Sequence, residues 1–162
     1  MNSDGYIEAF RRLDLHVCTN LHSVSYVMLA LRIHDSGASG LFVPTWHLAQ
    51  RTADVVADSI SRVVPPGVRS IKICLRSAGI VSAAYLEHAM TWTAFEKVLL
   101  ERVSKGVQEV AIEHRLPSAG TALLDTEIRG YFARLAGKGV LVVGESSAPQ
   151  DFDWHVPRIV LR

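Results

Sequence analysis

One pattern recurs along this chain and limits what it can fold into: an amphipathic helix, a glycine followed by valine, and a short strand rich in β-branched residues. The glycines of this pattern are Gly67, Gly106 and Gly139. Strands that alternate with helices pair in parallel and are joined by right-handed crossovers. We therefore expect an α/β fold of irregular repeated units, with a small, mostly parallel sheet covered by helices.

The first unit begins with a helix whose apolar residues recur every three or four positions and therefore share one face. These residues are Trp46, Ala49, Ala53, Val56, Ile60 and Val63. Thr45 can cap the helix, and residues 65–67, Pro-Pro-Gly, end it. From Ser70 onward apolar and polar residues alternate, which predicts a strand over 68–75 with one buried face.

The second unit resembles the first. Thr91 or Thr93 can cap its helix, and a glycine closes the helix before a strand over 107–112. The apolar face of this helix holds Trp92, Phe95, Leu99 and Val103. We expect Trp92, like Trp46 in the first unit, to pack in the core.

The third unit is shorter than the other two. Asp125 or Thr126 can begin its helix, whose inward residues are Ile128, Tyr131, Phe132 and Leu135. Residues 140–143 are all apolar, which predicts a strand buried on both faces. The three units together predict three neighbouring strands.

The remaining segments carry weaker patterns. They are an opening strand over 21–27, a short helix over 6–13, and surface loops over 35–40 and 116–121. Residues 145–162 form an irregular tail, in which 158–162 can add an edge strand. No domain boundary is evident, so we expect a single α/β domain over 1–162.

The charge balance narrows the classes of partner. The chain holds 17 Lys and Arg against 16 Asp and Glu, with the signs interspersed, so no basic stripe is available for a nucleic-acid backbone. It lacks the pattern of a signal peptide and any apolar run long enough to span a membrane. Cys18 and Cys74 are too few for a disulfide framework. We expect a soluble protein of the cytoplasm or nucleus with two free thiols and no nucleic-acid or membrane partner.

Residues 13–21, Leu-Asp-Leu-His-Val-Cys-Thr-Asn-Leu, fit a Leu-x-Leu-x-x-Cys-x-x-Leu repeat. Three later features fit the same family: Pro-Pro-Gly-Val-Arg-Ser-Ile-Lys-Ile at 65–73, the helix with Trp92 and Phe95, and the helix and strand over 128–143. Together they resemble the leucine-rich-repeat-like C-terminal region of F-box-type proteins of mushroom-forming fungi (basidiomycetes). The resemblance implies irregular leucine-rich-repeat-like units that bind partner proteins. The N-terminus is short and unlike an F-box, so recruitment of a ubiquitin ligase is not implied.

Parallel pairing of the predicted strands would align their polar residues on one face of the sheet. Ser70, Lys72 and Cys74 would lie beside Glu109, Ala111 and Glu113, with Ser23 and Ser25 at the flank. Such a face can serve as a recognition surface, or its Lys and Glu side chains can act as an acid/base pair. The alternative is a solvated face with ordinary cross-strand ion pairs.

Other candidate residues form no complete motif. The histidines lack zinc-ligand spacing, and no Gly-x-Gly-x-x-Gly or Walker-type loop is present, so we expect no metal and no cofactor. Glu113 and His114 are adjacent in a strand and should point to opposite faces. Residues 144–147 lack the second glycine of a nucleophile elbow and are interpreted as a loop. Trp154 lies in the irregular tail, where it can anchor a partner.

These observations predict a noncatalytic protein-interaction module. Its predicted binding residues are Ser70, Lys72, Cys74, Glu109, Glu113 and Trp154. The alternative is a small enzyme that acts on an organic metabolite in an apolar pocket, since fold does not determine function. Its acid, base or nucleophile would come from Glu109, Glu113, Lys72 and Cys74. A third option is that this chain is a fragment of a larger assembly, which it only stabilises.

Overall fold

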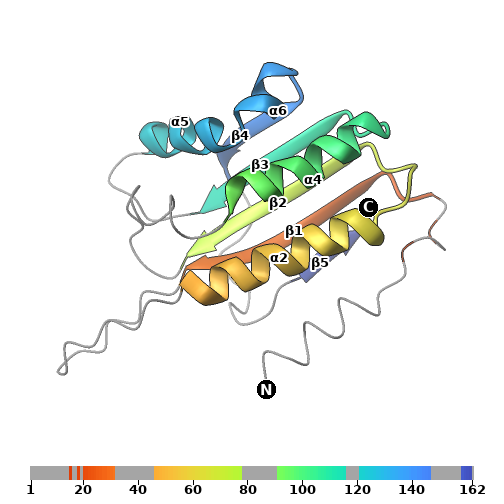
Figure 1. The fold of residues 1–162 in the computed structure, drawn as a ribbon, viewed down its shortest axis with the longest axis horizontal. Coiled ribbons are helices and arrows are strands. Elements are labelled where there is room, and N and C mark those ends of the chain that lie inside the picture. The colour runs from red at the N-terminus through yellow and green to blue at the C-terminus, as the bar shows by residue number, and fades with distance from the viewer. Residues whose placement is uncertain are drawn as a thin grey trace.

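The computed structural model describes residues 15, 18, 20–31, 46–77, 91–115, 121–146 and 158–161. In chain order the elements are β1 (Ser23–Leu31), α2 (Trp46–Arg62), β2 (Ser70–Ser77), α4 (Trp92–Ser104), β3 (Glu109–Arg115), α5 (Thr121–Tyr131), α6 (Ala133–Gly137), β4 (Leu141–Glu145) and β5 (Arg158–Leu161). The sheet has the order β4-β3-β2-β1-β5 (Figure 1). β1 to β4 are parallel, and β5 pairs antiparallel with β1. The predicted α/β fold with a mostly parallel sheet is confirmed, as is the edge strand near the C-terminus.

The strands that follow the glycine-valine pairs are neighbours, as predicted. β3 pairs in parallel with β2 on one side and with β4 on the other. Two of the three glycines adopt backbone angles that favour glycine, with φ of 112° at Gly106 and 70° at Gly139. Gly106 follows the end of α4 and Gly139 follows the end of α6. Each glycine therefore ends a helix and allows the chain to turn toward the next strand.

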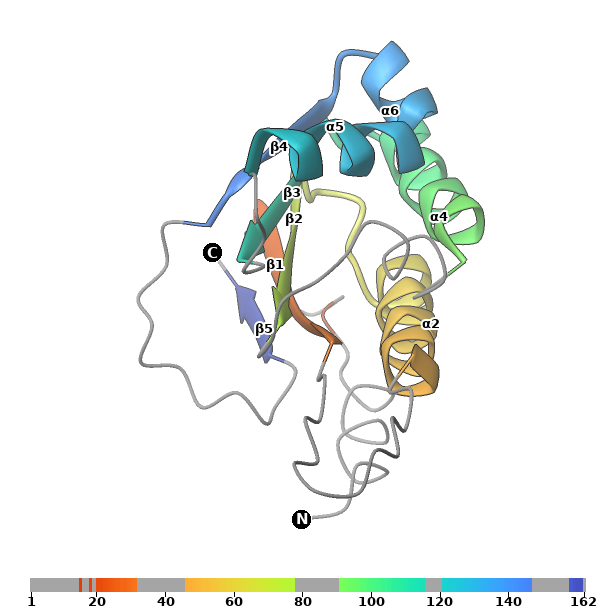
Figure 2. The same cartoon turned by 90° about the vertical axis from the view of Figure 1, so that its left-hand side faces the viewer.

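The described helices lie on one side of the sheet (Figure 2). α2 packs against β1 and α4, and α5 packs against β4. Fully buried residues of the strands on this side include Val24, Tyr26, Ile71, Ile73, Val110 and Ile112, and those of the helices include Ile60, Leu99, Ile128 and Leu135. Because side chains alternate along a strand, the residues between these buried strand positions point to the other face.

An aromatic cluster joins α4 to the α5 and α6 region. Trp92 is buried, as predicted, and its ring stacks on Tyr131 with centroids 4.8 Å apart. Phe132 meets Trp92 edge-on at 5.5 Å and Phe95 at 6.3 Å. Such pairs add to the stabilisation from burying the rings. The side chain of Trp46 lies outside the described residues.

Arg102 of α4 satisfies carbonyl groups at the end of α2. Its Nε donates to the Ile60 carbonyl at 2.7 Å, and an Nη donates to the Ser61 carbonyl at 2.8 Å. The last carbonyls of a helix have no partner within that helix. The guanidinium therefore joins α4 to the C-terminus of α2.

The third helix differs from its sequence prediction. It begins at Thr121 rather than at Asp125 or Thr126, and it breaks at Phe132 into α5 and α6. Thr121, predicted to end a loop, is thus helical, and residues 116–120 lie outside the described residues. The predicted inward residues Ile128, Phe132 and Leu135 are buried and Tyr131 is half-buried. These buried side chains hold both short helices against the rest of the core.

The prediction that strand 140–143 is buried on both faces is wrong. Val142 of β4 is 51% exposed, whereas Leu141 and Val143 are buried. The reason is that the described helices cover only one face of the sheet, so one residue in two points away from them.

The N-terminal cap of α4 and the bounds of β1 also differ from the predictions. Thr91 is the N-cap residue of α4 but makes no side-chain cap bond, and its hydroxyl instead bonds to Oε1 of Gln50 at 3.3 Å. The opening strand begins at Ser23 and extends to Leu31. The predictions for residues 6–13 and 35–40, for the Thr45 cap and for Trp154 lie outside the described residues.

Candidate functional site

The predicted binding residues of β2 and β3 lie together on the face of the sheet away from the helices. Ser70 is the register partner of Glu109, Lys72 of Ala111, and Cys74 of Glu113. On the other side of β2, Ser23 and Ser25 of β1 pair with Ser70 and Lys72. This register is the one that the sequence pattern predicts. We call Ser70, Lys72, Cys74, Glu109, Glu113 and Ser146 the polar sheet face.

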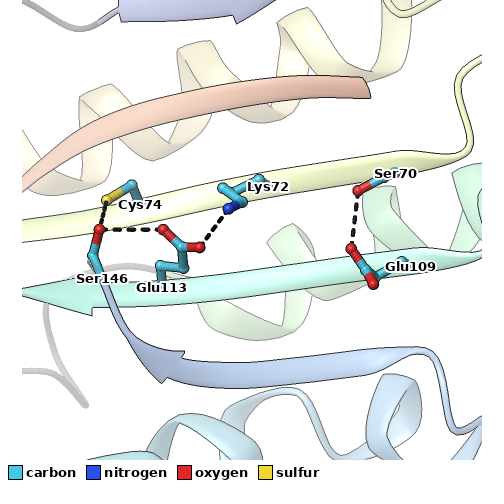
Figure 3. Close-up of polar contacts among 6 residues, drawn as sticks. All are labelled: Ser70, Lys72, Cys74, Glu109, Glu113 and Ser146. Atoms are coloured by element: carbon cyan, nitrogen blue, oxygen red, sulfur yellow. Dashed lines mark hydrogen bonds and ion pairs between the residues drawn. The ribbon is translucent and has the colours of Figure 1, made fainter. Parts of the chain in front are cut away.

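The polar sheet face contains two groups of side chains (Figure 3). In the first, the Ser70 hydroxyl donates to Oε1 of Glu109 at 3.1 Å. In the second, the Lys72 ammonium forms an ion pair with Oε1 of Glu113. The Lys72 and Glu113 side chains are 39% and 25% exposed, so water reaches both. An ion pair of this exposure contributes about 0–1 kcal/mol to stability, and its charges remain accessible to a partner.

Ser146, directly after β4, also belongs to the second group. Its hydroxyl donates to Oε2 of Glu113 at 3.2 Å, and the Cys74 thiol lies 3.6 Å from the same hydroxyl. The Ser146 amide donates to the His114 carbonyl at 2.9 Å and fixes its position. Sequence reasoning missed this role, because it considered Ser146 only as part of a failed nucleophile motif. The register of β4 beside β3 could have indicated this role. Gly144 pairs with Glu113, and Ser146 follows two residues later on the same face.

The second group is a chain of polar contacts from thiol to hydroxyl to carboxylate to ammonium. Both oxygens of Glu113 accept contacts, one from Ser146 and one from Lys72. Because each carboxylate oxygen can accept two hydrogen bonds, these contacts do not by themselves prevent Glu113 from acting as a general base. The Cys74 side chain is buried, which limits access of a substrate to its sulfur. Glu109 belongs to the first group, so the four residues proposed for an enzyme do not converge on one point.

His114 lies on the opposite face from Glu113, as expected for adjacent strand residues. It is fully buried, and its Nε2 contacts Oδ1 of Asp125 on α5. Within the described part of the chain, its Nδ1 has no hydrogen-bond partner. Glu113 and His114 therefore do not act on the same group.

Burial shifts two pKa values on the helix-covered face. It raises the pKa of Tyr26 to about 12, although a hydrogen bond shared with Ser59 at 3.3 Å and the charge of Arg102 act in the opposite direction. Burial also lowers the pKa of Arg102. Both groups belong to the packing of α2 and α4 on the sheet, away from the polar sheet face.

Within the described ranges, no group of three or more His, Cys, Asp and Glu side chains could hold a metal ion. In the same ranges, no helix combines the length and apolar character that crossing a membrane requires. Comparisons with protein-family models, with curated proteins and with solved structures found no match.

Proposed function

We propose that this chain is a noncatalytic protein-interaction module that binds a partner protein through the polar sheet face. The proposal is carried by one observation, the alignment of polar side chains of β2 and β3 on the face opposite the helices, where Glu109 is exposed and Ser70, Lys72 and Glu113 are half-buried. Parallel sheets usually have helices on both faces, and their strands are then apolar throughout. A parallel sheet with a polar, water-accessible face is instead suited to receive another surface.

Leucine-rich-repeat-like architecture is the finer part of this proposal. In such proteins each unit contacts only its neighbours, and the strands line one face of the array. The order of β1 to β4 in the sheet follows their order in the chain, and the described helices lie on one side, which supports the comparison. The resemblance to the repeat region of fungal F-box-type proteins points the same way.

The partner should present polar groups that complement both signs of charge. Glu109 is exposed and held by Ser70, while Lys72 and Glu113 offer an ammonium beside a carboxylate. Charges at an accessible surface select partners and speed association more than they raise affinity. We propose that this chain binds its partner inside the cell, in the cytoplasm or nucleus, where the free Cys18 and Cys74 would stay reduced.

The test begins with affinity purification of tagged chain from cells of the source organism, identification of co-purified proteins, and binding measurements with the purified partner. Two variants alter the charges. Glu109→Lys reverses an exposed charge, and the double variant Lys72→Glu with Glu113→Lys exchanges the two ends of the ion pair while keeping the pair. Each should weaken binding at least about tenfold, which corresponds to about 1.4 kcal/mol.

The matched control is Lys97→Glu. It makes the same type of charge change at an exposed position of α4, on the helix side of the sheet. Binding by this variant should equal that of the wild type. If the folded ion-pair exchange and Glu109→Lys variants also bind as the wild type does, the polar sheet face is not the binding surface.

A small enzyme is the second candidate, favoured by the chain of contacts from Cys74 through Ser146 to Glu113. A hydroxyl bonded to a carboxylate is one arrangement for removing a proton from a nucleophile. A thermal-shift screen against a metabolite library tests this candidate, because a ligand that binds the folded state raises the melting temperature. A ligand that stabilises the wild type but neither Glu113→Gln nor Cys74→Ala would support it. If no compound discriminates between the wild type and these variants, the enzyme hypothesis loses its support.

A further inference from the structure

The outer edge of β4 carries few of the features that protect edge strands from pairing with another chain. β4 ends the sheet on one side, and the later strand β5 adds to the opposite side, next to β1. Its sequence, Leu-Val-Val-Gly-Glu, contains neither lysine nor proline, its one charged residue is Glu145 at its end, and its pairing with β3 has no bulge. Charges, prolines and bulges are the means by which proteins keep edge strands from pairing with other chains. β5, in contrast, begins at Arg158 and is followed by Arg162.

The backbone of β4 presents its outward hydrogen-bonding groups at three residues. Val110 donates its N–H to the Val140 carbonyl at 2.8 Å, and Ser146 donates its N–H to the His114 carbonyl at 2.9 Å. Because residues of a strand alternate in direction, the even-numbered residues from 140 to 146 face β3. The N–H and C=O groups of Leu141, Val143 and Glu145 therefore point to the outer edge, where no described residue pairs with them.

We propose that β4 pairs antiparallel with β4 of a second copy of this chain, around a two-fold axis at Val143. In this register Val143 lies opposite the partner subunit's Val143, and Leu141 lies opposite the partner subunit's Glu145. Each of these pairs joins two residues with outward groups, so each exchanges two N–H···O bonds. The two sheets then form one continuous sheet, and this pairing does not use the polar sheet face.

A second copy fits this edge because β4 is complementary to itself. In the proposed register no two like charges lie opposite each other, since Glu145 meets an apolar residue at each end. Val142 is the one large hydrophobic side chain that is exposed in the described part of the chain. It lies opposite the partner subunit's Gly144, which has no side chain and leaves room for it. A two-fold contact also closes, so that both β4 edges are satisfied within a dimer.

Oligomeric state tests the proposal directly. Light scattering after gel filtration, over a range of protein concentrations, should give twice the chain mass of 17.8 kDa. Val142→Lys should weaken the dimer at least about tenfold, because the two new ammonium groups would be diagonal neighbours across the axis. Val142→Thr is the matched control, because it keeps a β-branched side chain without charge, and it should weaken the dimer less than about threefold.

Amide hydrogen exchange tests the register. Exchange at Leu141, Val143 and Glu145 should slow as protein concentration rises, whereas Val142 and Gly144, which bond to β3, should exchange slowly at every concentration. A chain that is monomeric throughout would overturn the proposal. A dimer that tolerates Val142→Lys, or that leaves the Val143 amide unprotected, would overturn it as well, as would growth into species larger than a dimer.

Discussion

Replacement of Glu96 tests how strongly α4 holds α6 in place. Glu96 is a buried carboxylate, only 4% exposed, on α4. Its Oε1 accepts hydrogen bonds from the amides of Arg134 at 2.8 Å and Leu135 at 3.1 Å, in the first turn of α6. Phe132, the N-cap residue of α6, makes no side-chain cap bond. Glu96 therefore caps α6 from another helix and places a negative charge at its N-terminus.

The magnitude follows from the two amides. Glu96→Ala leaves both without this acceptor, and each buried, unsatisfied donor costs about 1–3 kcal/mol. Because Arg134 is exposed and water can reach its amide, we expect a loss of about 2–4 kcal/mol in the free energy of unfolding. Glu96→Gln keeps an oxygen acceptor but loses the charge, and should cost about 1 kcal/mol. Glu101→Ala, an exposed site on the same helix, should stay within about 0.5 kcal/mol of the wild type.

Urea unfolding measures these differences, and amide hydrogen exchange locates them. In Glu96→Ala, exchange at Leu135 should become faster relative to exchange at Leu99, which lies in the middle of α4. The reasoning would be refuted if Glu96→Ala unfolded within about 0.5 kcal/mol of the wild type, or if Glu96→Gln were as unstable as Glu96→Ala. The second outcome would mean that charge, rather than the acceptor, is what α6 requires.

Two further predictions concern the helix-covered face. The pKa of Tyr26 is raised from 10.0 to about 12, so between these pH values the Tyr26 hydroxyl stays protonated in the folded state but ionises in the unfolded state. The contribution of Tyr26 to stability is therefore full below pH 10 and falls as pH rises toward 12. Urea unfolding should show the stability difference between wild type and Tyr26→Phe falling by about 2–3 kcal/mol over that range, and parallel pH profiles would contradict this. Arg102→Ala should lower the free energy of unfolding by about 2–4 kcal/mol, because the α2 carbonyls lose a charged donor. Lys97→Ala is its exposed control, and equal stability of the two variants would contradict the role of Arg102.

The sequence was sufficient to locate β2, β3 and β4 and to separate the two faces of β2. The glycine-valine pairs identify where β2, β3 and β4 begin, and the alternation from Ser70 onward separates Ile71 and Ile73 from Lys72 and Cys74. These are local properties, because a glycine at positive φ and an alternating strand depend on near neighbours in the chain. The pairing of Ser70 with Glu109 then follows from parallel strands that start at equivalent positions.

Contacts between helices of separate units, and those that β4 makes, became visible in the three-dimensional structure alone. The break at Phe132, the cap that Glu96 provides for α6, and the Arg102 bonds to α2 all depend on how helices from separate units pack. Ser146 joins Glu113 and Cys74 only when β4 is placed in register beside β3. Val142 is exposed although its neighbours in the sequence are apolar, because β4 lies at the end of a sheet with the described helices on one side. A local pattern specifies which side a residue takes on its own strand, whereas the groups that it touches are set by packing between segments far apart in the chain.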